Sequence, residues 1–230
     1  MRTVVVYVHG LWLGGGESFV LLRRLSRALG AECRAFKYSS AGATITDNVA
    51  SLEAYLGGIE ADTLHLLAHS MGGLLLVALF DPARVPGTRA RRAGPTLELP
   101  PGRIVLTGSP VRGSLSARRL ARLPFGRAML GPTAGEVLAG PPVERRWPGA
   151  RDLGVIAGDL GVGLGRLLGP MNGPNDGTVM VDETHLPGAA DQLRIRSSHT
   201  GLLFSAEVAR QAAAFLETGR FARPSRGCPG

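Results

Sequence analysis

The amino-acid sequence predicts an α/β protein with about six mostly parallel strands and helices on both faces of the sheet. Short apolar runs alternate with longer segments of helical periodicity, which is typical of strand-helix-strand units. The first run, residues 4–8, is apolar throughout, as in a strand that is covered on both faces. The 230 residues are 44% hydrophobic and 19% charged, which favours one folded domain with a substantial core over intrinsic disorder.

Three strands and two helices are expected before the first turn of chemical interest. The helix over residues 17–29 carries apolar side chains from Phe19 onward on one face and arginines on the other. The next helix begins at Thr44, where Asp47 follows at the spacing of a capping box. The three strands are expected over residues 4–8, 32–38 and 63–68.

The second half of the chain completes the alternation. After the third strand a tight turn leads into an apolar helix that ends at Asp81 and Pro82. The remaining elements are expected to be strands over 103–107, 153–157 and 192–196 and a final helix over 205–217.

Two segments interrupt this pattern. Residues 84–102 are rich in Arg, Pro and Gly, and we expect them to form an exposed basic loop. Residues 110–150 separate two strands and contain several prolines, which favours a lid-like excursion over one face of the sheet. We therefore predict a single domain over residues 1–220, with a flexible tail over 221–230.

The positive charge of the protein is concentrated in one stretch. The formal net charge is +8, yet residues 84–127 alone hold ten arginines and one acid, so they carry +9 and the rest of the chain carries −1. Clustered arginines attract phosphates, but no aromatic interleaving or binding motif accompanies them, so no nucleic-acid partner is expected. Two roles stay open for the basic amphipathic stretch 116–127. It can contact an anionic membrane surface weakly, or it can cover the active site with its arginine stems packed on apolar neighbours, and we favour the second.

Several other classes of protein are disfavoured. No apolar run approaches the roughly 20 residues of a membrane span, and the start of the chain lacks the pattern of a secretory signal. Two cysteines, Cys33 and Cys228, cannot make a disulfide framework, so we expect a cytoplasmic protein. Neither a metal motif such as H-E-x-x-H nor a phosphate-binding loop is present, and no cofactor or metal is expected.

The sharpest local motif surrounds a serine. In the run Ala-His-Ser-Met-Gly-Gly, Ser70 lies between a predicted strand and an apolar helix, with small residues two positions before and after it. Such a run allows a sharp, strained turn that exposes the serine hydroxyl as a nucleophile. The alternative is a glycine-rich helix start in which Ser70 is merely the N-cap.

A serine hydroxyl needs a base to take its proton, and only two histidines come late enough in the chain to serve. His199 follows the last predicted strand directly and is favoured, whereas His185 lies in a Thr-His-Leu-Pro loop typical of the surface. His69 is the neighbour of Ser70, but its side chain is expected to point away from the serine.

The base in turn needs a carboxylate, and the candidates late in the chain are Asp152, Asp159, Asp176, Asp182, Glu183 and Asp191. The two that are favoured most are Asp176 and Asp159. Asp176 stands in an Asn-Asp-Gly turn after the fifth strand, and Asp159 follows the same strand more closely. We favour Asp176 because the polar residues around it can hold a carboxylate in place, although Asn-Asp-Gly is also ordinary turn chemistry.

An acyl-transfer site also needs backbone donors for the oxyanion of the tetrahedral intermediate. One is expected from Met71, which follows the serine. The other is expected from Leu11, because the glycines after the first strand let the backbone approach a substrate closely.

Taken together, these motifs resemble those of bacterial α/β-hydrolase lipases and esterases. The resemblance rests on His9-Gly10-Leu11 after the first strand, the Ala-His-Ser-Met-Gly-Gly run, Asn175-Asp176-Gly177, and Ser198-His199-Thr200-Gly201. It is most similar to the small members with a reduced sheet, and it implies a reduced α/β-hydrolase fold. It further implies that Ser70 is the nucleophile, Asp176 the orienting acid and His199 the base, with Leu11 and Met71 forming the oxyanion hole.

The activity expected from this resemblance is that of a serine carboxylic-ester hydrolase. It would act through an acyl-enzyme on short to medium acyl esters or lipid-like esters, and Trp12, Leu123 and Phe125 are candidates for an apolar acyl pocket. Two alternatives remain open: a thioesterase or acyltransferase that uses the same triad, and a noncatalytic binding module with this fold. The sequence does not predict an oligomeric state.

Overall fold

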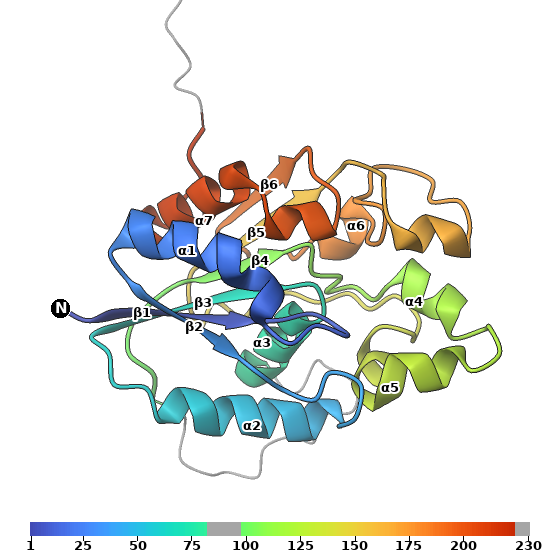
Figure 1. The fold of residues 1–230 in the computed structure, drawn as a ribbon, viewed down its shortest axis with the longest axis horizontal. Helices are drawn as coiled ribbons and strands as arrows, with labels where there is room; N and C mark the ends of the chain where they lie inside the picture. Colours follow the sequence, from blue (N-terminus) through green and yellow to red (C-terminus); the bar gives the residue numbers. More distant parts are fainter. Residues whose placement is uncertain (82–97, 224–230) are drawn as a thin grey trace, which may run out of the picture.

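One parallel sheet runs through the centre of the computed structural model, which describes residues 1–81 and 98–223 (Figure 1). Its six strands lie in the order β2-β1-β3-β4-β5-β6, and every neighbouring pair is parallel. The strands are β1 (Thr3–Val8), β2 (Glu32–Phe36), β3 (Thr63–His69), β4 (Ile104–Thr107), β5 (Leu153–Gly158) and β6 (Asp191–Ile195). The predicted α/β class and number of strands are thus confirmed.

Because all six strands are parallel, their carboxyl ends meet at one edge of the sheet. The N-terminus starts β1 at the left of Figure 1, so this edge lies on the right. Segments that are far apart in the sequence are brought together there, as is usual for functional sites of open parallel sheets.

Helices cover both faces of the sheet. Alternate residues of β1 show the division: Val4, Val6 and Val8 belong to one apolar core, and Val5 and Tyr7 belong to the other. The first core lies under α2 and α3, and the second lies under α1 and α7, which pack against each other. These helices are α1 (Phe19–Leu29), α2 (Ile45–Gly57), α3 (Gly72–Phe80) and α7 (Ala206–Thr218).

The helix starts follow local chemistry closely. Thr44 caps α2: its hydroxyl accepts the amide of Asp47 at 3.2 Å, and the Asp47 carboxylate accepts the amide of Thr44, which is the predicted capping box. The first predicted helix begins two residues late, because Gly16–Ser18 form a short 3-10 turn before α1. Phe19 was expected on the buried face but is 66% exposed, so the inward stripe begins at Leu21.

The excursion predicted between β4 and β5, here called the insert (residues 110–150), contains two helices. These are α4 (Leu115–Leu120) and α5 (Gly126–Val137), and α5 has a break at Gly131, next to Pro132. Both helices lie beyond the carboxyl ends of the strands (Figure 1). The predicted basic loop falls outside the described residues except for residues 98–102, as does the tail from residue 224.

Short helices complete the loops at the same edge of the sheet. They are η3 (Leu164–Leu168) and α6 (Val181–Thr184) after β5 and η4 (Thr200–Leu203) after β6. Among the helices of the two described ranges, none is long and apolar enough to cross a membrane.

Candidate active site

Ser70 occupies the sharp turn between β3 and α3. Its backbone has φ 54°, a left-handed conformation that costs a residue with a side chain roughly 1 to 2 kcal/mol. Two hydrogen bonds maintain this conformation: the Ser70 amide donates to the carbonyl of Thr107 at 2.9 Å, and the amide of Gly73 donates to the carbonyl of Ser70 at 3.1 Å. The serine is therefore fixed by the strand and helix on either side of it, and its side chain is partly exposed.

The turn is tightly packed, which explains the small residues around Ser70. A Cβ atom at Gly72 would lie 2.3 Å from the carbonyl oxygen of Val8 and 2.5 Å from that of His9. A Cβ atom at Gly10 would lie 3.0 Å from Cβ of Ser70. The loop after β1 therefore runs directly against the serine turn, where the oxyanion hole was predicted.

Asp176 and His199 form a hydrogen-bonded pair. Nδ1 of His199 lies 2.7 Å from Oδ2 of Asp176, and the amide of His199 donates to the Asp176 carbonyl at 2.8 Å. Because a carboxylate only accepts, Nδ1 must donate in this bond, so the neutral form of His199 has its proton on Nδ1 and its lone pair on Nε2. The pair is fixed through both backbone and side chain.

The Asp176 carboxylate is held in place on its other side as well. Oδ1 of Asp176 accepts the amides of Thr178 at 3.0 Å and Val179 at 2.7 Å, and the Asp176 amide donates to the Val179 carbonyl. The side chain is only 1% exposed. Its acceptor positions are thus occupied by fixed donors, a preorganised arrangement for orienting a histidine.

His69 connects this pair to the serine turn. Its ring lies 4.6 Å from the ring of His199, at an interplanar angle of 41°. Burial lowers the pKa of His69 well below its ordinary value of 6.5, and the nearby His199 lowers it further. His69 therefore stays neutral at physiological pH. From the sequence, its side chain was expected only to point away from Ser70, because the contact with His199 depends on how the loop after β6 folds back.

A second close approach brings the pair to the end of β4. A Cβ atom at Gly108 would lie 3.2 Å from Nδ1 of His199 and 3.3 Å from Oδ2 of Asp176. Gly108 follows Thr107, whose carbonyl accepts the Ser70 amide. The structure therefore brings Ser70, Asp176 and His199, which follow β3, β5 and β6, to the same edge of the sheet.

The competing candidates lie elsewhere. Asp159 makes an ion pair with Arg194 at 3.2 Å, with 26% of its side chain exposed. His185 is exposed, and its Nδ1 lies 3.2 Å from Oε1 of Gln192. Within the described ranges, no hydrogen bond or ion pair joins either of them to Asp176 or His199.

Of the two predicted oxyanion donors, Met71 directly follows Ser70, and Leu11 follows Gly10, which lies against the serine turn. Neither amide donates a hydrogen bond to another residue of the described ranges. Met71 directly precedes α3, whose N-terminal end favours negative charge. Beside Leu11, the ring of His9 stacks on that of Tyr38 at 4.2 Å, and its Nδ1 donates to the Gly10 carbonyl at 2.8 Å. Burial lowers the pKa of His9, so the ring that holds the Gly10 carbonyl is uncharged.

The three predicted pocket residues are exposed, Trp12 on the loop after β1 and Leu123 and Phe125 on the insert. Trp12 is 55% exposed, Leu123 is 50% and Phe125 is 85%. The indole N–H of Trp12 donates to the Met129 carbonyl at 2.8 Å, which joins the loop after β1 to α5. The three exposed side chains therefore offer apolar surface rather than the wall of a closed pocket. Within the described ranges, no group of three or more His, Cys, Asp or Glu side chains is arranged to hold a metal ion.

Solved structures with a similar fold include a lipase, a carboxyl esterase and a thioesterase domain. A lipase from Bacillus licheniformis, BlEst2 in propeptide form, superposes with a TM-score of 0.68 at 16% identity, covering all of this chain and 52% of the lipase. The metagenomic carboxyl esterase MGS0156 gives a TM-score of 0.53 at 17% identity, with 85% of this chain and 64% of the esterase covered. The Vlm2 thioesterase domain gives 0.51 at 10% identity, with 96% and 95% covered.

This chain thus spans about half to two thirds of the length of the first two proteins. No curated protein matches it in sequence. The model of the alpha/beta hydrolase family matches residues 5–223, nearly the whole chain. The protein belongs to the alpha/beta hydrolase family.

Proposed function

We propose that this protein is a serine hydrolase that cleaves carboxylic esters through an acyl-enzyme. The observation that carries the proposal is the Asp176–His199 hydrogen bond of 2.7 Å, which leaves an unprotonated nitrogen on a histidine whose ring packs against the neighbour of Ser70. A serine in a left-handed turn and an oriented histidine are the two parts that nucleophilic catalysis needs.

In this mechanism each residue has one task. Nε2 of His199 takes the proton of the Ser70 hydroxyl as its oxygen attacks the ester carbonyl. The amides of Leu11 and Met71 donate to the oxyanion that forms, and Asp176 stabilises the positive charge on His199. His199 then gives its proton to the departing alcohol. Water, activated by the same histidine, releases the acid and restores Ser70.

An apolar acyl group is the substrate feature that the surroundings favour. Exposed Trp12, Leu123 and Phe125 lie on the loop after β1 and on the insert. Arg122 and Arg127 are exposed beside the last two, so the same surface can contact an anionic lipid aggregate weakly. Proteins of similar fold include one named as a lipase and one named as a carboxyl esterase.

A series of p-nitrophenyl esters from acetate to dodecanoate tests the activity. We expect hydrolysis that is reduced at least a thousandfold by Ser70→Ala. We also expect Leu123→Ser with Phe125→Ser to lower kcat/KM for the longer esters while sparing the acetate. Hydrolysis that survives Ser70→Ala unchanged would refute the proposal.

A thioesterase is the second candidate, since the Vlm2 thioesterase domain shares the fold. The same serine, histidine and aspartate would serve, and only the leaving group would differ. Rates with matched acyl thioesters and oxygen esters decide between them: a much higher kcat/KM for the thioester favours the second candidate.

A further inference from the structure

A buried carboxylate outside the proposed triad lies just after the loop of Asp176. Glu183, in α6, is only 9% exposed. Its Oε2 accepts the amide of Met180 at 2.9 Å, and its Oε1 accepts the amide of Leu115, the first residue of α4. One carboxylate therefore binds the backbone of two segments that are far apart in the sequence.

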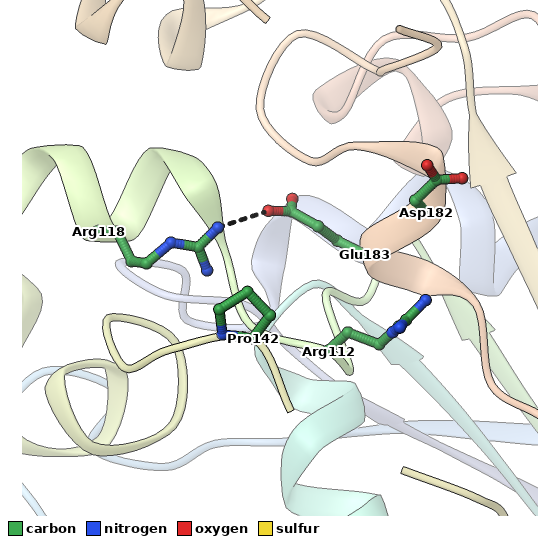
Figure 2. Close-up of a pocket in the computed structure, with 5 residues that line it drawn as sticks. All are labelled: Arg112, Arg118, Pro142, Asp182 and Glu183. Carbon is green, nitrogen blue, oxygen red and sulfur yellow. Dashed lines mark ion pairs between the residues drawn. The ribbon is translucent and has the colours of Figure 1, made fainter. Parts of the chain in front are cut away.

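An arginine of the insert completes this contact. Figure 2 shows Arg118, on α4, reaching toward Glu183 across a small cavity. Nη2 of Arg118 lies 3.8 Å from Oε1 of Glu183. The ion pair is long, so the two backbone amides are the closer partners of the carboxylate.

Two further hydrogen bonds join the same segments. The amide of Arg112 donates to the Glu183 carbonyl at 3.0 Å, and the hydroxyl of Ser116 donates to the Thr178 carbonyl at 2.6 Å. The beginning of the insert, residues 112–118, is thus attached along residues 178–183.

The attached segment is the one that fixes Asp176. Thr178 and Val179 donate their amides to Asp176, and Met180 pairs with Asn175 in an antiparallel bridge. Glu183 holds Met180, at one end of this turn, and Ser116 holds Thr178, in its middle. Displacement of either contact would move the amides that orient the Asp176 carboxylate.

Burial also makes this carboxylate costly. It raises the pKa of Glu183 above its ordinary value, and the nearby Asp176 raises it further, against the two amides and Arg118. A residue needed only to fill space would be apolar here, because an unsolvated charge lowers stability.

We propose that Glu183 is a positioning residue for the ester hydrolysis proposed above: it attaches the insert to the loop of Asp176 and thereby holds the Asp176 carboxylate against His199. It does not contact the reacting atoms. This inference rests on the proposed function, because it acts through the proposed orienting acid.

Glu183→Gln is the variant that tests it. Glutamine has the same shape but only one acceptor oxygen, so its NH2 group must face one of the two backbone donors and that contact is lost. We expect kcat for p-nitrophenyl esters to fall roughly tenfold with little change in KM, since a small misplacement of a catalytic group affects the chemical step. Rates are normalised to the serines that a fluorophosphonate probe labels, so that unfolded protein does not count.

A double-mutant cycle with Asp176→Asn separates positioning from a merely structural role. If Glu183 acts through Asp176, Glu183→Gln has no further effect on kcat in the Asp176→Asn background. An equal loss in both backgrounds, or no loss in either, overturns the inference. Glu144→Gln is the matched control, because the 92% exposed Glu144 pairs with Arg112 of the same segment, and we expect it to keep full activity.

Ser116→Ala provides a second variant should Glu183→Gln fold poorly. It removes the bond to the Thr178 carbonyl, and we expect a smaller loss of kcat that also disappears with Asp176→Asn. If Ser116→Ala lowers kcat by the same factor in the parent protein and in the Asp176→Asn background, the inference is overturned. If Ser70→Ala abolishes activity while both variants behave like the parent protein, only this inference fails. If Ser70→Ala retains activity, the proposed function fails as well.

Discussion

At the residue scale, the Asp176–His199 pair determines where protons lie in the site. The 2.7 Å hydrogen bond places a proton on Nδ1, and the two amides bound to Oδ1 keep the carboxylate from rotating away. The neutral ring of His69 packs against the ring of His199. Both oxygens of the Asp176 carboxylate, which orients His199, therefore accept hydrogen bonds from fixed donors.

Replacing Asp176 with Asn should lower kcat for p-nitrophenyl esters by roughly a thousandfold or more. The amide NH2 of asparagine can face Nδ1 and favour the wrong tautomer of His199, although the shape is kept. Asp159→Asn is the control: its carboxylate pairs with Arg194 on the surface, and kcat should stay within about twofold of the parent. A large loss for Asp159→Asn with none for Asp176→Asn would reverse the assignment of the acid.

Stability below neutral pH should depend on His65. This histidine of β3 is 6% exposed, and its Nδ1 accepts the amide of Arg103 at 3.0 Å. Burial, with the charges of Arg103 and Arg151, lowers its pKa from 6.5 to about 4. The unfolded chain gains a proton below pH 6.5 that the folded chain does not accept until about pH 4, so stability falls through this window as pH decreases.

The expected contribution of His65 is roughly 2 to 3 kcal/mol between these two pH values. Denaturant unfolding of the parent and of His65→Asn across pH 4 to 7 measures it: the variant should lose less stability by this amount. His185 is exposed, so His185→Gln serves as the control: its free energy of unfolding should change with pH as that of the parent does. Equal slopes for His65→Asn and the parent would contradict this account.

The sequence predicted the three candidate triad residues because Ser70 and His199 stand in short motifs directly after strands and Asp176 stands in an Asn-Asp-Gly turn. It left Asp159 as a competitor, and only the hydrogen bond from His199 distinguishes the two aspartates. The contact between His69 and His199 was beyond sequence reasoning, since it depends on how β3 pairs with β4 and how the loop after β6 returns. Glu183 was weighed only as one of several possible acids, because its contacts span residues 115–183.

At the element scale, the serine turn depends on the close approach of two backbones. The end of β1 passes within 2.3 Å of where a Cβ at Gly72 would lie, so the strand and α3 cannot both keep their places around a larger residue. The strands and flanking helices were predictable from periodicity and caps. In the insert, the amphipathic stretch 116–127 covers most of α4, but α5 was not located, because Phe125, with φ 62°, and Gly131 break the chain at points without regular apolar spacing.

Gly72→Ala should destabilise the protein by roughly 2 to 3 kcal/mol, because the new methyl group meets backbone atoms that have little room to move. Gly135→Ala is the matched control, for which we expect a change in stability of the opposite sign. This glycine lies within α5 with no atom within 4 Å of its added Cβ, so alanine should stabilise by about 0.5 to 1 kcal/mol. Chemical denaturation of both variants measures the difference, and a neutral Gly72→Ala would show that the turn adapts easily.

At the scale of the whole molecule, the parallel sheet assembles the site. Ser70 follows β3, Asp176 follows β5 and His199 follows β6, and the strand order places their carboxyl ends along one edge. The insert joins them there, since Ser116 and Glu183 tie it to the loop of Asp176 and Trp12 contacts α5. The basic stretch predicted from the sequence is divided by this arrangement: Arg118 faces Glu183, and Arg122 and Arg127 face outward.

The most direct test of the central claim is covalent labelling by a fluorophosphonate probe, read by intact mass and peptide mapping. The account predicts one probe per chain, attached to Ser70, with no labelling of Ser70→Ala and labelling at least a hundredfold slower for His199→Ala. Folded protein that remains unlabelled, or Ser70→Ala protein that is labelled as fast as the parent, would contradict the assignment of Ser70 as a nucleophile activated by His199.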